Sequence, residues 1–211
     1  MRIFIPYKTT PDNGLEMKYV IRSMVKHFKD MTGCLIVGDK PDWYKGDHIY
    51  YTDVTNRKEY SIYRKLILIK ETVLHLNDDF FALQDFGADL PNYYSGTCRD
   101  KLMVTTDRVY KELYLNCLPE WLNFDIHCPM VIDTRRFDWD IDRPLKTYYG
   151  NQNKIPGVQI IDCKIRGDLS YSEVKERIYR RPFFSTHDNA GKLQVLRVLN
   201  ELYPDKSKYE L

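Results

Sequence analysis

Several features that define whole classes of protein are missing from this sequence. No apolar stretch approaches the ~20 residues needed to cross a bilayer. No signal peptide is visible, because Met1 and Arg2 lead straight into a strand-like run that ends at Pro6. Repeats, low-complexity segments, linkers and heptads are absent as well, so no solenoid or coiled coil is indicated and the oligomeric state is left open. We therefore expect a soluble, cytoplasmic protein with no membrane span.

A strong excess of charge of one sign is also missing. The chain has 32 Lys and Arg residues against 30 Asp and Glu residues, which gives a formal net charge of +2. Proteins whose main task is to neutralise a polyanion usually carry a clear basic excess. The composition therefore disfavours that class, although it leaves room for a local basic face.

Cysteines are few and show no recognisable framework. They are odd in number, scattered along the chain, and nowhere form C-x-x-C: Cys34, Cys98, Cys117, Cys128 and Cys163. This usage indicates free, mostly buried thiols in a reducing compartment.

The residues that are present favour one globular domain. Hydrophobic residues make up 43% of the 211 residues, which is enough for a substantial core. Tyrosine is frequent, at 17 residues. Such rings suit sites that stack on bases or sugars, and they suit half-buried strands equally well.

The order of elements at the start of the chain predicts an α/β fold. Residues 2–7 are a buried strand, residues 15–28 carry apolar side chains at helical spacing, and residues 34–39 are a second buried strand. Strand, helix and strand in this order predict a βαβ unit and a parallel sheet.

The rest of the chain continues the alternation. The pattern predicts further strands at residues 48–51, 80–83, 130–133 and 158–163, and further helices at residues 60–75, 100–118 and 188–202. Residues 85–96 and 144–157 show no clean period and are expected to be loops.

The most informative segment is the acidic turn Asn77-Asp78-Asp79, which lies between apolar residues. Two adjacent carboxylates resist ionising together unless a positive charge compensates them. Hard oxygen ligands in small number suit Mg²⁺ or Mn²⁺. In an α/β chain, an acidic turn just before a strand, here the one expected at residues 80–83, also falls where ligands bind, outside the strand ends. The alternative is that either aspartate caps the next element or forms an Asx turn.

Five segments together resemble a group of sugar transferases. The group includes small phage and bacterial glycosyltransferase-like proteins and the Stealth-type sugar-1-phosphate transferases of capsule synthesis. Residues 12–23 resemble its D-N-x-E-L-x-Y-S-L-R-S segment, residues 36–43 its I-V-G-D-x-P-x-W turn, and residues 76–81 its N-D-D-x-F motif. Residues 127–129 resemble an H-x-P element and residues 185–188 a terminal S-x-N/H-D element. The segments occur in family order along nearly the whole chain.

The resemblance implies a single GT-A-like domain with a Rossmann-like, mostly parallel central sheet flanked by helices. Residues 1–84 would form the nucleotide-binding half, and residues 85–211 the half that completes the acceptor and metal sites. The acidic turn would replace the D-x-D motif, with Asp79 as the direct metal ligand and as a catalytic residue. Asp78 would lie near the ribose or a metal-bound water. Because Asn77 occupies the first position of the motif, the roles of Asp78 and Asp79 remain interchangeable.

Further nucleotide contacts follow from the same resemblance. Tyr7 would stack on the base, Lys8 would meet a phosphate, and Asp39 would bind the base or ribose. Each has an alternative reading as an ordinary strand-end or turn residue.

Two cations on helices extend this set. Arg22 would grip the diphosphate, since a planar guanidinium binds phosphate bidentately. Lys65 would add a positive charge near the acidic turn, with Arg64 an equal rival by composition. Arg22 could instead be solvated.

Among the histidines, His187 would complete the metal site and His127 would lie on the acceptor side, where an imidazole can act as a base. Arg135 would offset charge on the leaving group. A purely structural role is the alternative for each. The remaining candidates are assigned to the structure (His27, His48 and His75) or to either the cleft or packing (Tyr148, Tyr149 and Asn151).

The resulting hypothesis is a metal-dependent glycosyltransferase that moves a sugar from a nucleotide-diphosphate sugar, with Mn²⁺ or Mg²⁺, to an acceptor hydroxyl. The acceptor would be a glycan, a protein or a hydroxymethylated base of phage DNA, and a phage-encoded enzyme would act in the host cytoplasm. The alternatives are a Stealth-like sugar-1-phosphate transferase and a non-catalytic module that binds nucleotide or carbohydrate.

Overall fold

A five-stranded sheet forms the centre of the molecule. The computed structural model describes residues 1–55, 57–160, 164–187 and 192–211. The strands are β1 (Arg2–Tyr7), β2 (Gly33–Gly38), β3 (Asp47–Tyr50), β4 (Thr72–His75) and β7 (Met130–Asp133), in the order β3-β2-β1-β4-β7. The first four are parallel and β7 pairs antiparallel with β4. The predicted α/β fold with a mostly parallel central sheet is therefore confirmed.

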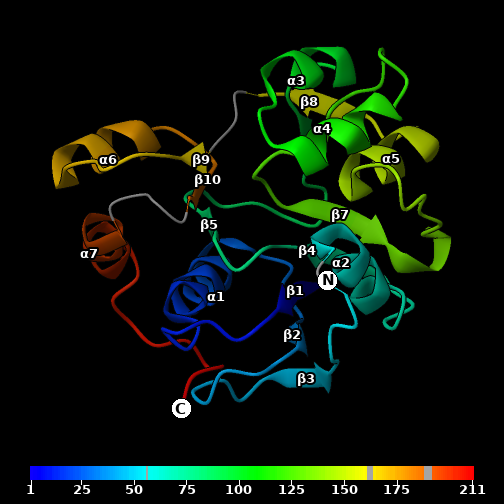
Figure 1. Ribbon diagram of the computed structural model, residues 1–211. Helices are drawn as coiled ribbons and strands as arrows, with labels where there is room; N and C mark the ends of the chain where they lie inside the picture. Colours follow the sequence, from blue (N-terminus) through cyan, green and yellow to red (C-terminus); the bar gives the residue numbers. More distant parts are fainter. Residues whose placement is uncertain (56, 161–163, 188–191) are drawn as a thin grey trace.

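Helices cover both faces of this sheet (Figure 1). On one face, α1 (Leu15–His27) buries Met17, Val20, Ile21 and Met24 in the same cluster as Ile3, Ile5 and Leu74 of the sheet. On the other face, α2 (Lys58–Leu66) buries Ile62 and Leu66 against Phe4, Val37 and Val73. Adjacent strand residues thus point into different clusters, which is why these strands are apolar throughout rather than alternating.

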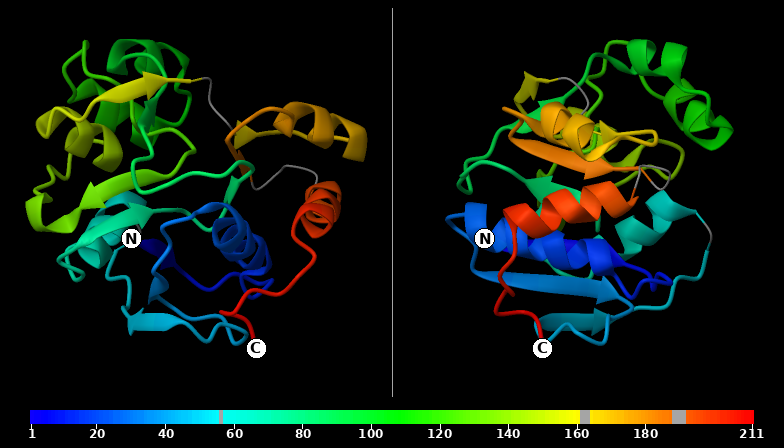
Figure 2. Two further views of the ribbon diagram at one scale, coloured as in Figure 1. Left: turned by 180° about the vertical axis from the view of Figure 1, so that it is seen from behind. Right: turned by 90° about the vertical axis from the view of Figure 1, so that its left-hand side faces the viewer.

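The other elements form two groups that lie mostly toward the β4–β7 side of the sheet, away from β3 (Figures 1 and 2). One is a small sheet in the order β5-β10-β9, made of β5 (Phe80–Ala82), β10 (Phe183–Thr186) and β9 (Lys164–Ile165), with α6 (Tyr171–Ile178) and α7 (Lys192–Leu202) beside it. The other contains the β6–β8 pair (Asn92–Tyr94 and Gly157–Gln159), α3 (Cys98–Val104), α4 (Arg108–Leu115), a 3₁₀ turn at Thr134–Arg136 and α5 (Leu145–Gln152).

The helix expected at residues 60–75 is wrong in its second half. The helix α2 ends at Leu66, Lys70 adopts a left-handed φ of 53°, and β4 follows. A short buried strand is apolar on both faces, so its hydrophobic pattern cannot be distinguished from the continuation of a buried helix.

Two other predicted segments differ from the structure because each contains the start of a helix that was not predicted. The single helix expected at residues 100–118 is two helices, since Asp107 accepts a hydrogen bond from the Tyr110 backbone N–H and so caps α4. Residues 144–157, expected to be a loop, contain α5. Its first backbone N–H, that of Leu145, donates to Glu59 at 3.0 Å, so the partner lies on α2 rather than in the local sequence.

The remaining differences are smaller. The expected loop at residues 85–96 contains β6, and no prediction was made for α6, β9 and β10. The expected strand at 158–163 overlaps β8, with residues 161–163 outside the described part of the chain. The expected helix at 188–202 is observed from Lys192, and residues 188–191 lie outside the described ranges.

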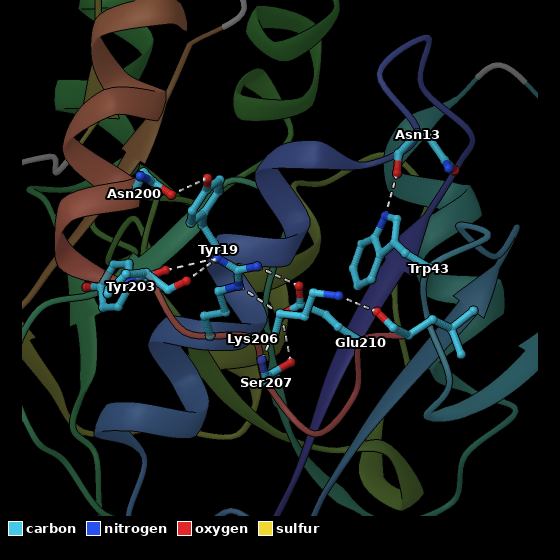
Figure 3. Close-up of polar contacts among 11 residues, drawn as sticks. Asn13, Tyr19, Trp43, Asn200, Tyr203, Lys206, Ser207 and Glu210 are labelled. Atoms are coloured by element: carbon cyan, nitrogen blue, oxygen red, sulfur yellow. Dashed lines mark hydrogen bonds and ion pairs between the residues drawn. The ribbon is translucent and has the colours of Figure 1, made fainter.

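The last residues of the chain return to its first half. The Leu211 backbone N–H donates to the Trp43 carbonyl at 2.9 Å, and that of Lys45 donates to the Tyr209 carbonyl at 3.0 Å. Figure 3 shows this segment, with Glu210 close to Ser207 and Lys206. The end of the second half, residues 85–211, is thus hydrogen-bonded to the first half, residues 1–84. No described helix has the length and apolar character that a membrane span requires.

Candidate functional site

A cavity of about 1000 Å³ opens at the carboxyl ends of β1 and β4. Its walls include residues from the loop after β1, from the turn after β4, and from the first turns of α2 and α5. The chain leaves β1 toward β2 on one side, whereas β4 lies on the other side, so the cavity is at the point where the strand order reverses. Ligands of open α/β sheets bind at this topological switch point.

The acidic turn Asn77–Asp79 connects β4 to β5 and lines this cavity. All three residues are half-buried. Burial, followed by repulsion from Asp78, raises the pKa of the Asp79 carboxyl to about 7, although Lys164 and Lys58 act in the opposite direction. The turn is thus a place where a further positive charge would be strongly stabilised.

A third carboxylate lies close to the turn. Glu16, in the first turn of α1, lines the same cavity and accepts a hydrogen bond from the Thr186 hydroxyl at 3.3 Å. Burial raises the pKa of Glu16, and Asp78 raises it further, while Lys192 lowers it. No role was expected for Glu16 from the sequence.

Basic side chains line the same cavity as the acidic turn. They come from α2, α3, β9 and the segment after it, and the start of α7, which are distant from one another in the sequence: Lys58, Lys101, Lys164, Arg166 and Lys192. None of them was proposed from the sequence. Their common feature is their place in the fold, and an anionic ligand is the partner that this arrangement favours.

The donor set of the turn fits a hard divalent cation. Asp78 and Asp79 offer carboxylate oxygens, and Mg²⁺ is typically held by one or two carboxylates together with substrate phosphates and water. His187 lines the same cavity, and its backbone N–H donates to the Ile165 carbonyl at 3.0 Å. Within the part of the chain that the structure describes, no three His, Cys, Asp or Glu side chains are grouped to hold a metal ion. The three-residue set Asp78, Asp79 and His187 thus stays a prediction, and Asp188 lies outside the described residues.

The structure also brings His127 to the cavity. Its ring lies 6.4 Å, centroid to centroid, from the ring of Phe80, which directly follows the acidic turn. His127 thus lines the cavity close to the residue that follows the acidic turn, and its role toward an acceptor stays a prediction.

Arg22 and Arg135 are not brought to the cavity, which corrects the roles assigned to them. Two nitrogens of the Arg22 guanidinium donate to the Glu210 carboxylate at 2.9 and 2.7 Å, and a third donates to the Tyr203 carbonyl at 3.0 Å. Arg135 pairs with the neighbouring Asp133 at 2.8 Å on the surface. Both guanidiniums therefore serve local structure, and neither lines the cavity.

Four other predicted residues gather at the ends of β1 and β2, next to the cavity but outside its lining. The Tyr7 hydroxyl accepts from the Thr10 backbone N–H at 3.2 Å, and Lys8 is exposed. Asp39 accepts from the Thr9 backbone N–H at 2.7 Å, which lowers its pKa. Lys65 is buried and pairs with Asp53 at 2.9 Å. Their roles toward a nucleotide stay predictions.

The aromatic residues of α5 have packing roles. The Tyr149 hydroxyl accepts from the Asp133 backbone N–H at 2.8 Å, the Tyr148 ring contacts Trp121, and Asn151 exchanges hydrogen bonds with the Leu122 backbone. The cavity is lined instead by the first residues of α5, Leu145 and Lys146.

The inner wall of the cavity is built around Glu59 in the first turn of α2. Its carboxylate accepts hydrogen bonds from the Tyr110 hydroxyl at 3.1 Å and from the Leu145 backbone N–H at 3.0 Å. Burial and then the charge of Asp125 raise the pKa of Glu59 to about 7. This wall could not be found from the sequence, since α2, α4 and α5 meet there only through tertiary packing.

Glu59 makes stability depend on pH. Because its folded pKa lies above the ordinary value of 4.5, its contribution is fully favourable below pH 4.5 and is lost as the pH rises through about 7. We expect Glu59→Gln to remove this loss, so that the variant gains on the order of 1–2 kcal/mol relative to the wild type between pH 5 and pH 8. Urea unfolding at both pH values measures the difference.

The matched control for this experiment is Glu176→Gln, which changes an exposed glutamate on α6. It should leave the pH dependence of the wild type unchanged. If the free energy of unfolding changed with pH by the same amount in the wild type and in Glu59→Gln, Glu59 would not be the source of this loss.

Comparisons with known proteins assign no family to the chain. No model of a known protein family matches the chain, and no curated protein does. A solved structure with a similar arrangement is the apo-form glycosyltransferase GlyE of Streptococcus pneumoniae TIGR4, with a TM-score of 0.48 and 10% sequence identity. The match covers 97% of this chain and 60% of that one, so the chain spans less than two thirds of that protein. At this similarity, a functional conclusion has to come from the cavity itself.

Proposed function

We propose that the protein is a metal-dependent glycosyltransferase that transfers a sugar from a nucleotide-diphosphate sugar to an acceptor hydroxyl. The observation that carries this proposal is the position of the acidic turn: Asp78 and Asp79 follow β4 at the switch point of the sheet and face a large cavity. The motif resemblance of residues 76–81 and 127–129 to sugar transferases supports it.

The proposed roles follow from charge. Asp78 and Asp79 would hold Mg²⁺ or Mn²⁺, which supplies positive charge beside a diphosphate leaving group. Lys164, Arg166 and Lys192 carry the further positive charge that the phosphate oxygens require. On the same wall, the His127 imidazole would accept the proton of the acceptor hydroxyl.

The acceptor is proposed as a glycan, a protein or a hydroxymethylated DNA base. A cavity of about 1000 Å³ is large enough for a sugar nucleotide together with the end of an acceptor. Transfer of sugar-1-phosphate would use the same cation and diphosphate with the acceptor on the other side. The mass of the product distinguishes the two reactions.

A thermal-shift screen tests the proposal. UDP-, GDP- and CMP-sugars are added with and without Mn²⁺, followed by a turnover assay with any donor that binds. At a hundredfold excess over Kd, we expect a metal-dependent rise in Tm of roughly 5–10 °C. Binding without turnover would support a non-catalytic module, and the absence of any metal-dependent shift would refute the nucleotide-sugar hypothesis.

A further inference from the structure

His75, which the sequence analysis assigned to the structure, is an unusual residue of the cavity wall. It ends β4 and its side chain is only 1% exposed, yet neither ring nitrogen has a hydrogen-bond partner among the described residues. The ring lies 5.6 Å from that of Phe4 and lines the cavity. Buried polar groups are almost always paired, so this imidazole is expected to find its partner in a ligand.

Lys146 offers unused donors on the same wall. It is 5% exposed, and its ammonium donates to the Cys128 carbonyl at 3.0 Å while lying 4.7 Å from the centre of the Phe80 ring. An ammonium has three N–H donors, and only this one hydrogen bond to a described residue is formed. Burial lowers the pKa of Lys146, and the charges of Asp125, Glu59 and Asp79 raise it. Lys146 therefore belongs to the inner wall, on the side next to Phe80 and the acidic turn.

Asp125 adds acceptors beside it. Its Oδ2 lies 3.5 Å from the Tyr114 hydroxyl, and its Oδ1 accepts no hydrogen bond from a described residue. Its backbone N–H donates to the Asn123 side chain and to the Thr147 hydroxyl, both at 3.1 Å, so its position is fixed. The carboxylate is thus held in place at the cavity wall with spare acceptor capacity.

The chemistry of these three side chains selects the ligand. Asp125 accepts, Lys146 donates, and the imidazole of His75 does both, which is the combination that neighbouring hydroxyl groups require. A phosphate is disfavoured here by the carboxylates of Asp125 and Glu59, whereas Lys164 and Lys192 act on the acidic turn and Glu16 and favour a phosphate on that side. In a nucleotide-diphosphate sugar, the diphosphate carries the sugar at one end and the nucleoside at the other, and the contacts predicted for the nucleoside lie elsewhere, at the ends of β1 and β2.

We propose that His75, Asp125 and Lys146 form a subsite that binds the hydroxyl groups of the donor's sugar. This inference rests on the proposed function, because it takes the diphosphate to lie at the acidic turn. Glu59 is a positioning residue of the subsite, since it fixes the first turn of α5, from which Lys146 extends.

The test separates binding of the sugar from binding of the nucleotide. Kd is measured by calorimetry with Mn²⁺ for UDP against UDP-glucose and for GDP against GDP-mannose. We expect each of three variants, His75→Leu, Lys146→Met and Asp125→Asn, to raise the Kd of the sugar nucleotide by at least about tenfold. The Kd of the nucleoside diphosphate alone, UDP or GDP, should stay unchanged. Because His75→Leu removes two unpaired buried atoms with little change in volume, its ligand-free Tm should equal or exceed that of the wild type.

His27→Leu is the matched control. His27 lies at the end of α1, bonds to Asp85 at 2.9 Å and does not line the cavity, so this variant should bind both members of each pair like the wild type. Equal weakening of diphosphate and sugar nucleotide by the three cavity variants, or no weakening, would overturn the subsite while nucleotide binding stands. If the wild type binds neither pair with Mn²⁺, the proposed function itself fails, and the subsite fails with it.

Discussion

Asp79→Asn is expected to lower turnover with a nucleotide-sugar donor by at least ~100-fold, because removal of one charge-stabilising group from a transition state has effects of this size. The amide keeps the size of the side chain but loses the negative charge that a divalent cation requires. Asp78→Asn should have an effect of the same kind, and the ratio of the two losses would assign the direct ligand. Initial rates over a range of Mn²⁺ concentrations measure both.

Asp89→Asn is the control for this pair. Asp89 is exposed and lies outside the cavity lining, so its replacement should leave the rates and their Mn²⁺ dependence unchanged. Retention of full Mn²⁺-dependent activity in both turn variants would contradict the assignment of the acidic turn.

Arg22→Met is expected to destabilise the fold strongly without affecting donor binding. The side chains of Arg22 and Glu210 are 11% and 2% exposed, and they form a two-point ion pair between α1 and the C-terminal segment. Removal of one partner of a buried ion pair leaves the other charge uncompensated and lowers the free energy of unfolding by about 3–5 kcal/mol. Denaturant unfolding measures this loss, and calorimetry with UDP at low temperature measures binding.

The comparison variant is Arg135→Met, which removes an exposed arginine that pairs with Asp133. Exposed pairs contribute about 0–1 kcal/mol, so this variant should be nearly as stable as the wild type. If Arg22→Met instead weakened UDP binding while retaining stability, the diphosphate role expected from the sequence would be restored.

The first βαβ unit could be predicted from the sequence because its signals are local. Residues 2–7 and 34–39 are short apolar runs, and the helix between them has apolar residues at helical spacing, as β1, β2 and α1 confirm. The strand β4 was missed because a strand buried on both faces has no period that separates it from a helix. The helix α5 was missed because its N-terminus is capped by Glu59 from a distant part of the chain.

The same distinction applies to the site. The acidic turn is contiguous in the sequence, so it could be singled out there. It was expected just before the strand at residues 80–83, and the structure shows that it also follows β4 and lines the cavity. Glu59, Asp125 and Lys146 are separated by more than sixty and by about twenty residues, and only packing of α2 and α5 on the sheet brings them together. Arg22 is the opposite case. It lies in a segment that resembles the family motif, yet its guanidinium forms an ion pair with Glu210 that holds the C-terminal segment against α1.

Electrostatics gives the cavity two different regions. Asp78, Asp79 and Glu16 form an acidic centre with basic side chains around it, a combination suited to a cation and a diphosphate. The inner wall around His75, Asp125 and Lys146 instead offers mixed donors and acceptors that suit hydroxyl groups. Such a division would orient a sugar nucleotide in one direction, with its sugar innermost.

The central claim is that Asp78 and Asp79 hold a cation against a diphosphate, and anomalous X-ray scattering from crystals of the protein grown with Mn²⁺ and UDP tests it most directly. The account predicts one strong manganese peak about 2.0–2.3 Å from a carboxylate oxygen of the acidic turn, with diphosphate oxygens completing its coordination. A diphosphate bound elsewhere, or a manganese ion bound without contact to either aspartate, would contradict it.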